Sequence, residues 1–331
     1  ETLRKTVTAF RFSWEGQVFS VGVSIGLVSI TEASGSLDEV LSHADAACYA
    51  AKDRGRNRVH LFQPDDIQAQ ERQGQIQWAS RLQEALDKVL FRLYFQTIVP
   101  LENSDNIMPH YEILARMIGP EGEIIPPGAF IPAAERFGLM PKIDQWVIRN
   151  TLAWMGDQLR QNQQPVFCSI NLSGASIGRE DCLQLIQEQL EKRKVPANNI
   201  CFEITETAAI ADPANAGRFI TELKRLGCQF ALDDFGSGLA SFGYLKQLPV
   251  DYLKIDGIFI QELANNRIDQ AMVASINNIG HIMGLKTIAE FVEDAATLNI
   301  LRQIGVDYVQ GYYLSRPEPM ESLTSVRVMP R

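Results

Sequence analysis

The chain has 331 residues, of which 46% are apolar, and a formal net charge of −9 at pH 7. This length predicts two folded units, or one large barrel with an additional fragment. The negative charge argues against binding to nucleic-acid polymers or to anionic membrane surfaces. No apolar run approaches the ~20 residues that a membrane-spanning helix needs, and no signal-peptide pattern opens the chain.

The five cysteines are widely spaced and include no Cys-x-x-Cys pair. An odd number of isolated cysteines is typical of buried thiols in a reducing compartment. We therefore expect a cytoplasmic chain, or the cytoplasmic part of a larger, membrane-anchored protein with sensory domains upstream.

Residues 1–62 predict a small α+β fragment. A strand is expected within 17–30, a helix with one apolar stripe over 37–52, and a closing strand over 59–62. Two strands and a helix cannot bury both faces of a sheet, so we expect this segment to be part of a larger domain.

Two motifs stand out in this segment: Val23-Ser-Ile-Gly-Leu and Ala44-Asp-Ala-Ala-Cys-Tyr-Ala-Ala-Lys-Asp-Arg-Gly-Arg-Asn57. They resemble the C-terminal half of the GGDEF family of bacterial diguanylate cyclases. In that family Lys52 would lie near a nucleotide phosphate, although a lysine at a helix C-terminus is also favourable for the helix dipole alone. The catalytic Gly-Gly-Asp/Glu-Glu-Phe turn is not in the sequence, so we expect no cyclase activity.

Residues 63–81 are polar and rich in glutamine, which predicts a helical linker. From residue 91 onward, apolar strands alternate with helical stripes over about 240 residues, as in a (β/α)8 TIM-like barrel. The first two strands precede any helix, so the first strand is expected to run antiparallel. An open doubly wound sheet is the alternative, but no Gly-x-Gly-x-x-Gly follows a strand. We expect the barrel to span 82–325, with strands at 93–100, 111–116, 166–172, 200–204, 230–232, 252–255, 286–289 and 308–310.

Polar residues follow the apolar run at seven strand ends in succession. They are Glu112, Asn171, Glu203, Asp233 with Asp234, Lys254, Glu290 and Gln310. The carboxyl ends of barrel strands meet at one mouth, where active sites lie. Desolvating several carboxylates together is costly, and one lysine cannot neutralise five of them. Oxygen ligands without histidine or cysteine favour Mg²⁺ or Mn²⁺ over zinc.

A site with two divalent cations suits phosphodiester hydrolysis. We expect Asp233 to bridge the cations and Asp234 to bind one of them, while a protonated Lys254 orients the attacking water. A lyase or aldolase that uses Lys254 as a Schiff base is a further alternative. The expected metal ligands are Glu112, Asn171, Glu203, Asp233, Asp234 and Glu290, and the expected catalytic residues are Glu112, Asp233, Asp234, Lys254 and Glu290.

The strand-end motifs form a set. They are Glu112-Ile-Leu-Ala-Arg116, Ile170-Asn-Leu-Ser, Phe202-Glu-Ile-Thr-Glu206, Leu232-Asp-Asp-Phe-Gly-Ser-Gly238, Leu253-Lys-Ile-Asp256, Ala289-Glu-Phe-Val-Glu293 and Gln310-Gly-Tyr. Together they resemble the EAL family of cyclic di-GMP phosphodiesterases. The resemblance implies a metal-dependent barrel enzyme that hydrolyses cyclic di-GMP to linear 5′-pGpG. It also implies a homodimer through the barrel, near residues 241–263.

The same resemblance implies roles around the metals. Substrate contacts are implied for Arg116, Glu135, Asn171, Asp256 and Gln310, and anchoring of the loop after Asp234 for Glu206, Gly236, Gly238 and Glu293. Two simpler interpretations remain open: Asp256 as a helix cap, and Arg116 in a structural salt bridge.

Two positions depart from the family pattern. Ile113 replaces the eponymous alanine, and Phe291 stands where the family usually has glycine. The metal-ligand positions all hold competent residues, which favours an active enzyme. The alternative is a catalytically weak receptor that binds cyclic di-GMP and signals through the linker.

Overall fold

The structure, a computed structural model, describes residues 1–14, 17–31, 34, 36–53, 55–63, 78–102, 108–236 and 242–324. The chain divides into two compact units, Glu1–Arg81 and Leu82–Arg331. In the described residues, no helix combines the length and the apolar character that crossing a membrane requires.

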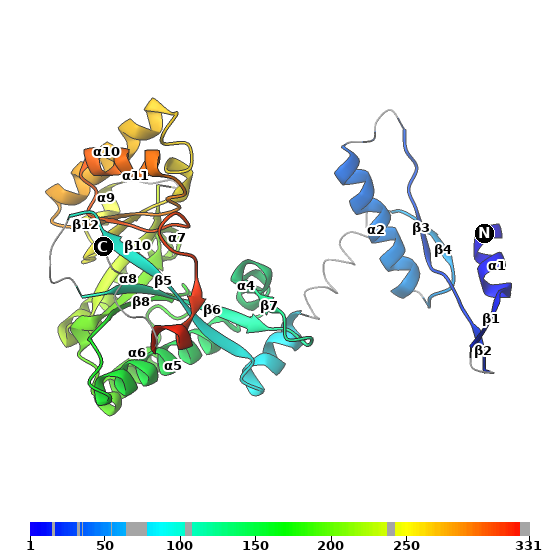
Figure 1. Cartoon of the computed structure of the whole chain (residues 1–331), viewed down its shortest axis with the longest axis horizontal. Helices are drawn as coiled ribbons and strands as arrows, with labels where there is room; N and C mark the ends of the chain where they lie inside the picture. Colours follow the sequence, from blue (N-terminus) through cyan, green and yellow to red (C-terminus); the bar gives the residue numbers. More distant parts are fainter. Residues whose placement is uncertain are drawn as a thin grey trace. The chain divides into compact units, whose positions relative to one another are not determined.

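In the part of residues 1–63 that the structure describes, the first unit has two small pairs of strands and the helices α1 and α2 (Figure 1). Strands β1 and β2 form an antiparallel hairpin, whereas β3 and β4 pair in parallel. The strand expected within 17–30 is therefore two strands, because its halves hydrogen-bond in separate sheets; the expected helix and closing strand are present. The elements are α1 (Thr2–Ala9), β1 (Arg11–Trp14), β2 (Gln17–Ser20), β3 (Ile25–Leu27), α2 (Leu37–Asp53) and β4 (Val59–Leu61).

Helix α2 packs directly on the backbone of β3. A Cβ atom at Gly26 would lie 2.4 Å from the amide nitrogen of Cys48 and 2.5 Å from the carbonyl oxygen of Ala44. The facing helix residues Ala47 and Ala51 are fully buried. Small residues on both elements thus allow the close approach. Residues 64–77, most of the expected linker, lie outside the described part of the chain, and 78–87 are helical.

The second unit is a closed barrel of eight strands. Strand β5 pairs with both β6 and β13, which closes the sheet, and it runs antiparallel to both. The other neighbours in the barrel are parallel. The predicted TIM-like barrel and its antiparallel first strand are confirmed, and an open sheet is excluded. The strands are β5 (Phe91–Pro100), β6 (His110–Ile118), β8 (Phe167–Leu172), β9 (Ile200–Thr205), β10 (Gln229–Phe235), β11 (Tyr252–Ile255), β12 (Lys286–Ala289) and β13 (Tyr308–Val309).

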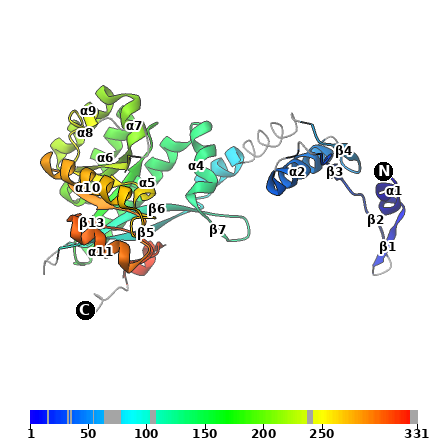
Figure 2. The same ribbon diagram turned by 90° about the horizontal axis from the view of Figure 1, so that it is seen from above.

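Two short strands extend the barrel sheet: β7 (Ile124–Ile125) pairs with β6, and β14 (Glu318–Pro319) pairs with β5. Helices gather around the barrel strands in both views (Figures 1 and 2). They are α4 (Pro127–Arg136), α5 (Met140–Arg160), α6 (Glu180–Arg193), α7 (Glu206–Ala211), α8 (Pro213–Leu226), α9 (Phe242–Leu245), α10 (Arg267–Ile282) and α11 (Ala295–Ile304), with 3₁₀ turns η1 (Ala197–Asn199), η2 (Gly257–Phe259) and η3 (Met320–Thr324).

Helix α8 shows how the sequence determines where a helix begins, where it ends and which face it buries. The Asp212 side chain accepts a hydrogen bond from the backbone N–H of Asn215 and so caps the first turn. Gly227 ends the helix with φ +106°, a left-handed conformation that glycine adopts readily. Between the caps, apolar residues at helical spacing are buried. They are Ala216, Phe219, Ile220 and Leu223.

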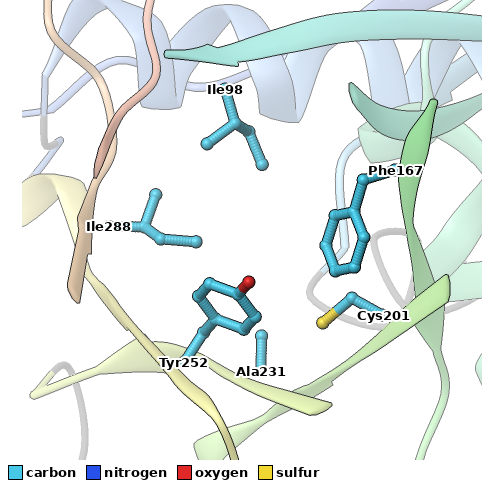
Figure 3. Close-up of a cluster of buried hydrophobic side chains, with 6 residues drawn as sticks. All are labelled: Ile98, Phe167, Cys201, Ala231, Tyr252 and Ile288. Carbon is cyan, nitrogen blue, oxygen red and sulfur yellow. The ribbon is translucent and has the colours of Figure 1, made fainter. Parts of the chain in front are cut away.

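An apolar layer fills the barrel near the amino ends of its parallel strands. Figure 3 shows six side chains that come from six strands and point toward a common centre. They are Ile98, Phe167, Cys201, Ala231, Tyr252 and Ile288. This layer closes one end of the barrel, so the polar strand ends gather at the other end.

Candidate active site

Lys254 lies at the centre of the polar end of the barrel. Its side chain is fully buried on β11. Its Nζ lies 2.6 Å from Oε2 of Glu203, 2.9 Å from Oε1 of Glu290 and 3.0 Å from Oδ1 of Asp233. Oε2 of Glu112 is 3.8 Å away. Residues on β6, β9 and β10 and the residue after β12 therefore place carboxylates around one ammonium group. Glu112 was expected at a strand end, but it is the third residue of β6, which continues to Ile118.

A second network orients Glu112. The amide of Asn171 donates to Oε1 of Glu112 at 2.7 Å, and the amide of Gln310 donates to Oε2 at 2.6 Å. Gln310 also donates to Oε1 of Gln96 at 3.1 Å, and Gln96 donates to the carbonyl oxygen of Ser315 at 2.9 Å. Both oxygens of Glu112 are thus held in place by amides.

Sequence reasoning missed Gln96. It lies opposite Glu112 in the register of β5 with β6, is buried, and lines the same cavity. Its signal is a polar residue between apolar residues of a predicted strand, a weak signal because Thr97 and Arg92 lie in the same strand. Because β5 is antiparallel, Gln96 reaches the site from mid-strand and does not follow the strand-end rule.

The turn of the chain at Asp233 and Asp234 brings adjacent carboxylates together. On a regular strand, neighbouring side chains point to opposite faces. Here the register of β10 with β11 shifts between Leu232 and Phe235, and Asp234 has φ +54°. A bulge of this kind redirects a side chain. Asp233, Asp234 and Glu290 each offer an oxygen within 4.8 Å of those of the other two.

These residues fit divalent cations. Five carboxylates, those of Glu112, Glu203, Asp233, Asp234 and Glu290, gather near the ammonium of Lys254. Within the described residues, the buried Oε1 of Glu203 has no hydrogen-bond partner. An unpaired buried carboxylate oxygen is costly unless it binds a cation. The donor set, which consists of oxygen atoms, matches Mg²⁺ or Mn²⁺.

Burial and crowding of charge shift the titration of the site. Burial, with added repulsion from Glu112, raises the pKa of Glu203 to about 8 despite the attraction of Lys254. Burial and the charges of Asp233 and Asp256 raise the pKa of Asp234 to about 6. The surrounding carboxylates outweigh burial and raise the pKa of Lys254, so its ammonium stays protonated.

A cavity of about 330 Å³ opens beside these carboxylates. Its wall includes Asp234, Glu290, Gln310 and Arg116. The Arg116 guanidinium lies 5.4 Å from the centroid of the Tyr94 ring and is half-buried. Stacking on the tyrosine holds this cation at the wall, so it can face an anionic ligand.

Two other predicted substrate residues, Glu135 and Asp256, are not among the residues that line this cavity. Glu135 on α4 is exposed and lines a second cavity of about 310 Å³, together with Asn171. Asp256 accepts a hydrogen bond from the backbone N–H of Ile258 at 2.9 Å, the capping geometry that the simpler interpretation predicts. Its charge also acts on Asp234.

The loop after Asp234 begins with a contact to Glu206. The backbone N–H of Gly236 donates to Oε2 of Glu206 at 2.9 Å. Gly236 has φ +100°, and a Cβ there would lie 2.6 Å from the ring of Phe259. Gly238 lies outside the described residues, and Glu293 is exposed at the first cavity. Their roles in anchoring the loop stay predictions.

The closed barrel and its acidic, lysine-centred site define a TIM-like barrel protein with polar chemistry at the carboxyl ends of its strands. The model of the EAL domain family matches residues 79–317, and the chain belongs to this family. The model described as diguanylate cyclase, GGDEF domain, matches residues 1–58.

Curated relatives carry related names. The chain is 42% identical over 306 residues to cyclic di-GMP phosphodiesterase PdeB of Shewanella oneidensis, covering 92% of this chain and 35% of the relative. It is 33% identical over 318 residues to cyclic di-GMP phosphodiesterase PdeF of Escherichia coli, covering 94% of this chain and 41% of the relative. The chain thus spans less than half the length of these two proteins.

Solved structures share the barrel. The FimX EAL domain from Pseudomonas aeruginosa bound to c-di-GMP has a TM-score of 0.68 and 34% identity, covering 73% of this chain and 96% of that one. The PaMucR phosphodiesterase in complex with c-di-GMP has a TM-score of 0.69 and 32% identity, covering 75% of this chain and 99% of that one.

Proposed function

We propose that this chain is a metal-dependent phosphodiesterase that hydrolyses cyclic di-GMP to linear 5′-pGpG. The observation that carries the proposal is the group of carboxylates around the buried ammonium of Lys254, beside an open cavity. Membership of the EAL family supports it, as do the names of the curated relatives.

Two divalent cations, Mg²⁺ or Mn²⁺, fit the residues of this site. The proposed ligands are Glu112, Asn171, Glu203, Asp233, Asp234 and Glu290, with Asp233 shared between the two cations. When bound, such cations supply positive charge and lower the pKa of a water molecule. The unpaired Oε1 of Glu203 and the excess of carboxylates support this assignment.

The chain's own residues position the reaction. Lys254 holds its proton, so it acts as a hydrogen-bond donor that orients water and stabilises negative charge on the phosphate. Asn171 and Gln310 keep Glu112 in one orientation. In hydrolysis the water oxygen bonds to phosphorus and the bond to one ribose 3′ oxygen breaks. That oxygen takes up a proton, which leaves a 5′-phosphate on a linear dinucleotide.

Product analysis tests the proposal. The purified chain is incubated with cyclic di-GMP and Mg²⁺ or Mn²⁺, and the nucleotides are separated by ion-exchange chromatography. We expect linear pGpG, and none when EDTA is present. Glu112→Ala should lose hydrolysis at least about 100-fold, a loss typical of removing a group that acts in the transition state. Full activity of Glu112→Ala would contradict the assignment of Glu112.

A receptor that binds cyclic di-GMP without turnover is the second candidate. The direct contacts of Lys254 with three carboxylates favour a receptor, because the ammonium neutralises part of the negative charge of the site without cations. Binding without any linear product would establish the receptor. A Schiff-base enzyme is disfavoured, because a nucleophilic amine must be unprotonated and the carboxylates raise the pKa of Lys254.

We also propose the organisation of the chain. The expected segments are a partial GGDEF-like domain over 1–62, a helical linker over 63–81 and the EAL barrel over 82–325. A homodimer through the barrel near residues 241–263 is proposed from the family resemblance. Light scattering over a range of concentrations tests it, and a constant monomer mass would contradict it.

A further inference from the structure

Phe291 is an aromatic residue in an unfavourable backbone conformation at the wall of the first cavity. It follows Glu290, is 51% exposed, and has φ +53°. Left-handed φ values are uncommon for bulky residues, because the Cβ atom approaches the backbone. Such conformations persist where the surroundings impose them, and they cluster at functional sites.

The surroundings of Phe291 impose this conformation. The next residue, Val292, is fully buried; its N–H donates to the carbonyl of Gln310 at 3.0 Å, and its carbonyl accepts from the N–H of Tyr313 at 3.0 Å. A Cβ atom at Gly311 would lie 2.1 Å from the carbonyl oxygen of Val292, so these segments are in close contact. The backbone at 291 is therefore fixed by its neighbours, and a phenylalanine occupies a position that suits glycine better.

The ring of Phe291 has a defined place. A Cβ atom at Gly257 would lie 2.3 Å from Cδ2 of the ring, so the ring packs against the bare backbone of η2. Tyr312 lines the same cavity, but the guanidinium of Arg316 lies 4.8 Å from the centroid of its ring. Phe291 thus gives the cavity a half-exposed aromatic ring that packs against the backbone of η2 at Gly257.

We propose that Phe291 stacks on one guanine base of cyclic di-GMP and sets the affinity of this site for a purine dinucleotide. The inference rests on the proposed function. A planar base and an aromatic ring attract each other through their faces, and such stacking does not depend on hydrogen bonds. Arg116 lines the same cavity and can meet the phosphate, so the cavity offers a stacking surface and a cation to one half of the ligand.

Calorimetric titration of the full chain with cyclic di-GMP in EDTA measures binding without turnover. We expect Phe291→Leu, which keeps a bulky apolar side chain without a π-face, to raise the Kd about 10- to 100-fold. Phe291→Tyr keeps the ring and should bind within about twofold of the wild-type chain, because its stacking surface is the same. Tyr313→Leu is the matched control: Tyr313 is 48% exposed and is not among the described residues that line this cavity.

With Mg²⁺ present, Phe291→Leu should raise KM and leave kcat within about threefold. Stacking on the base stabilises the bound substrate and the transition state equally, and losing such an interaction raises KM without changing kcat. An unchanged or lower Kd for Phe291→Leu would overturn the inference, because the ring would then only narrow the cavity. If Phe291→Leu does not fold, as judged by its unfolding midpoint, Phe291→Asn replaces it, because asparagine tolerates positive φ. Wild-type chain that neither binds in EDTA nor forms linear pGpG with Mg²⁺ overturns the proposed function, whereas wild-type binding or hydrolysis with unaffected variants overturns the stacking alone.

Discussion

The Nζ of Lys254 and the Oε2 of Glu203 lie 2.6 Å apart, and both side chains are almost completely buried. The other oxygen of Glu203 has no hydrogen-bond partner within the described residues. One oxygen is thus paired and the other is available for a cation. Lys254 neutralises part of the cluster, and the remaining negative charge is what divalent cations would bind.

Replacing Lys254 tests its share of this charge. Lys254→Met leaves buried carboxylates without their counter-charge, so in EDTA we expect the free energy of unfolding to fall by about 3–5 kcal/mol, as for a broken buried ion pair. Chemical denaturation measures it. Lys88→Met is the control, because Lys88 pairs with Glu84 at an exposed site and should have no measurable effect. Equal effects of the two variants would contradict the central position of Lys254.

Asp233→Asn separates metal binding from folding. The amide keeps the shape of the side chain and removes one of five crowded negative charges. In EDTA we therefore expect an unfolding midpoint no lower than that of the wild-type chain. Mg²⁺ should raise the wild-type midpoint by preferential binding to the folded state, and this rise should disappear in Asp233→Asn. A Mg²⁺-dependent rise of wild-type size in the variant would argue against Asp233 as a ligand.

The apparent affinity for Mg²⁺ should depend on pH. Cation ligands bind in their deprotonated form, so protons compete with the metal. Because the pKa values of Asp234 and Glu203 are raised to about 6 and about 8, affinity should fall as the pH is lowered from 8 to 5. Titration of Asp234 alone gives a decrease of about tenfold, and protonation of Glu203 adds to it. Calorimetric titrations at these pH values measure the change; a constant affinity would be inconsistent with carboxylate ligands of raised pKa.

Stability without metal should change in the opposite direction. The folded chain holds a proton on Glu203 up to about pH 8, whereas the unfolded chain releases it near 4.5, the usual pKa of a glutamate side chain. The folded state binds more protons in this window, so stability falls as the pH rises. Burial lowers the pKa of His110 to about 3, so the unfolded chain binds a proton there that the folded chain does not, and this makes stability rise with pH. The contribution of His110 ends near pH 6.5, the usual pKa of histidine. Thermal unfolding in EDTA between pH 6.5 and 8 should show the midpoint decreasing.

Gly236→Ala tests the start of the loop. The residue has φ +100° and faces the ring of Phe259, so an alanine combines backbone strain with a clash. Gly138→Ala is a matched control, because Gly138 has φ +64° and no atom within 4 Å of its Cβ position. We expect both variants to lose about 1 kcal/mol through strain. Gly236→Ala should lose more stability and also hydrolysis, and equal behaviour in both assays would count against a functional loop.

The fold was largely readable from the sequence. Eight apolar runs separated by helical stripes correspond to the eight barrel strands, within a few residues at their ends. Periodicity determines this outcome, because each element must bury one apolar face. The pattern did not reveal β1, β7 or β14, which are short and gain their hydrogen bonds from neighbours that no local signal specifies.

The residues of the candidate site were also readable, since parallel strands bring their carboxyl ends to one place. The sequence did not predict how these side chains are arranged in the site. Adjacent side chains Asp233 and Asp234 meet Glu290 through a register shift and a left-handed φ, which depend on β11. Gln96 enters the site through the register of β5 with β6, which places it opposite Glu112. Chain order and residue type specify which groups are available, whereas contacts between distant segments decide which atoms meet.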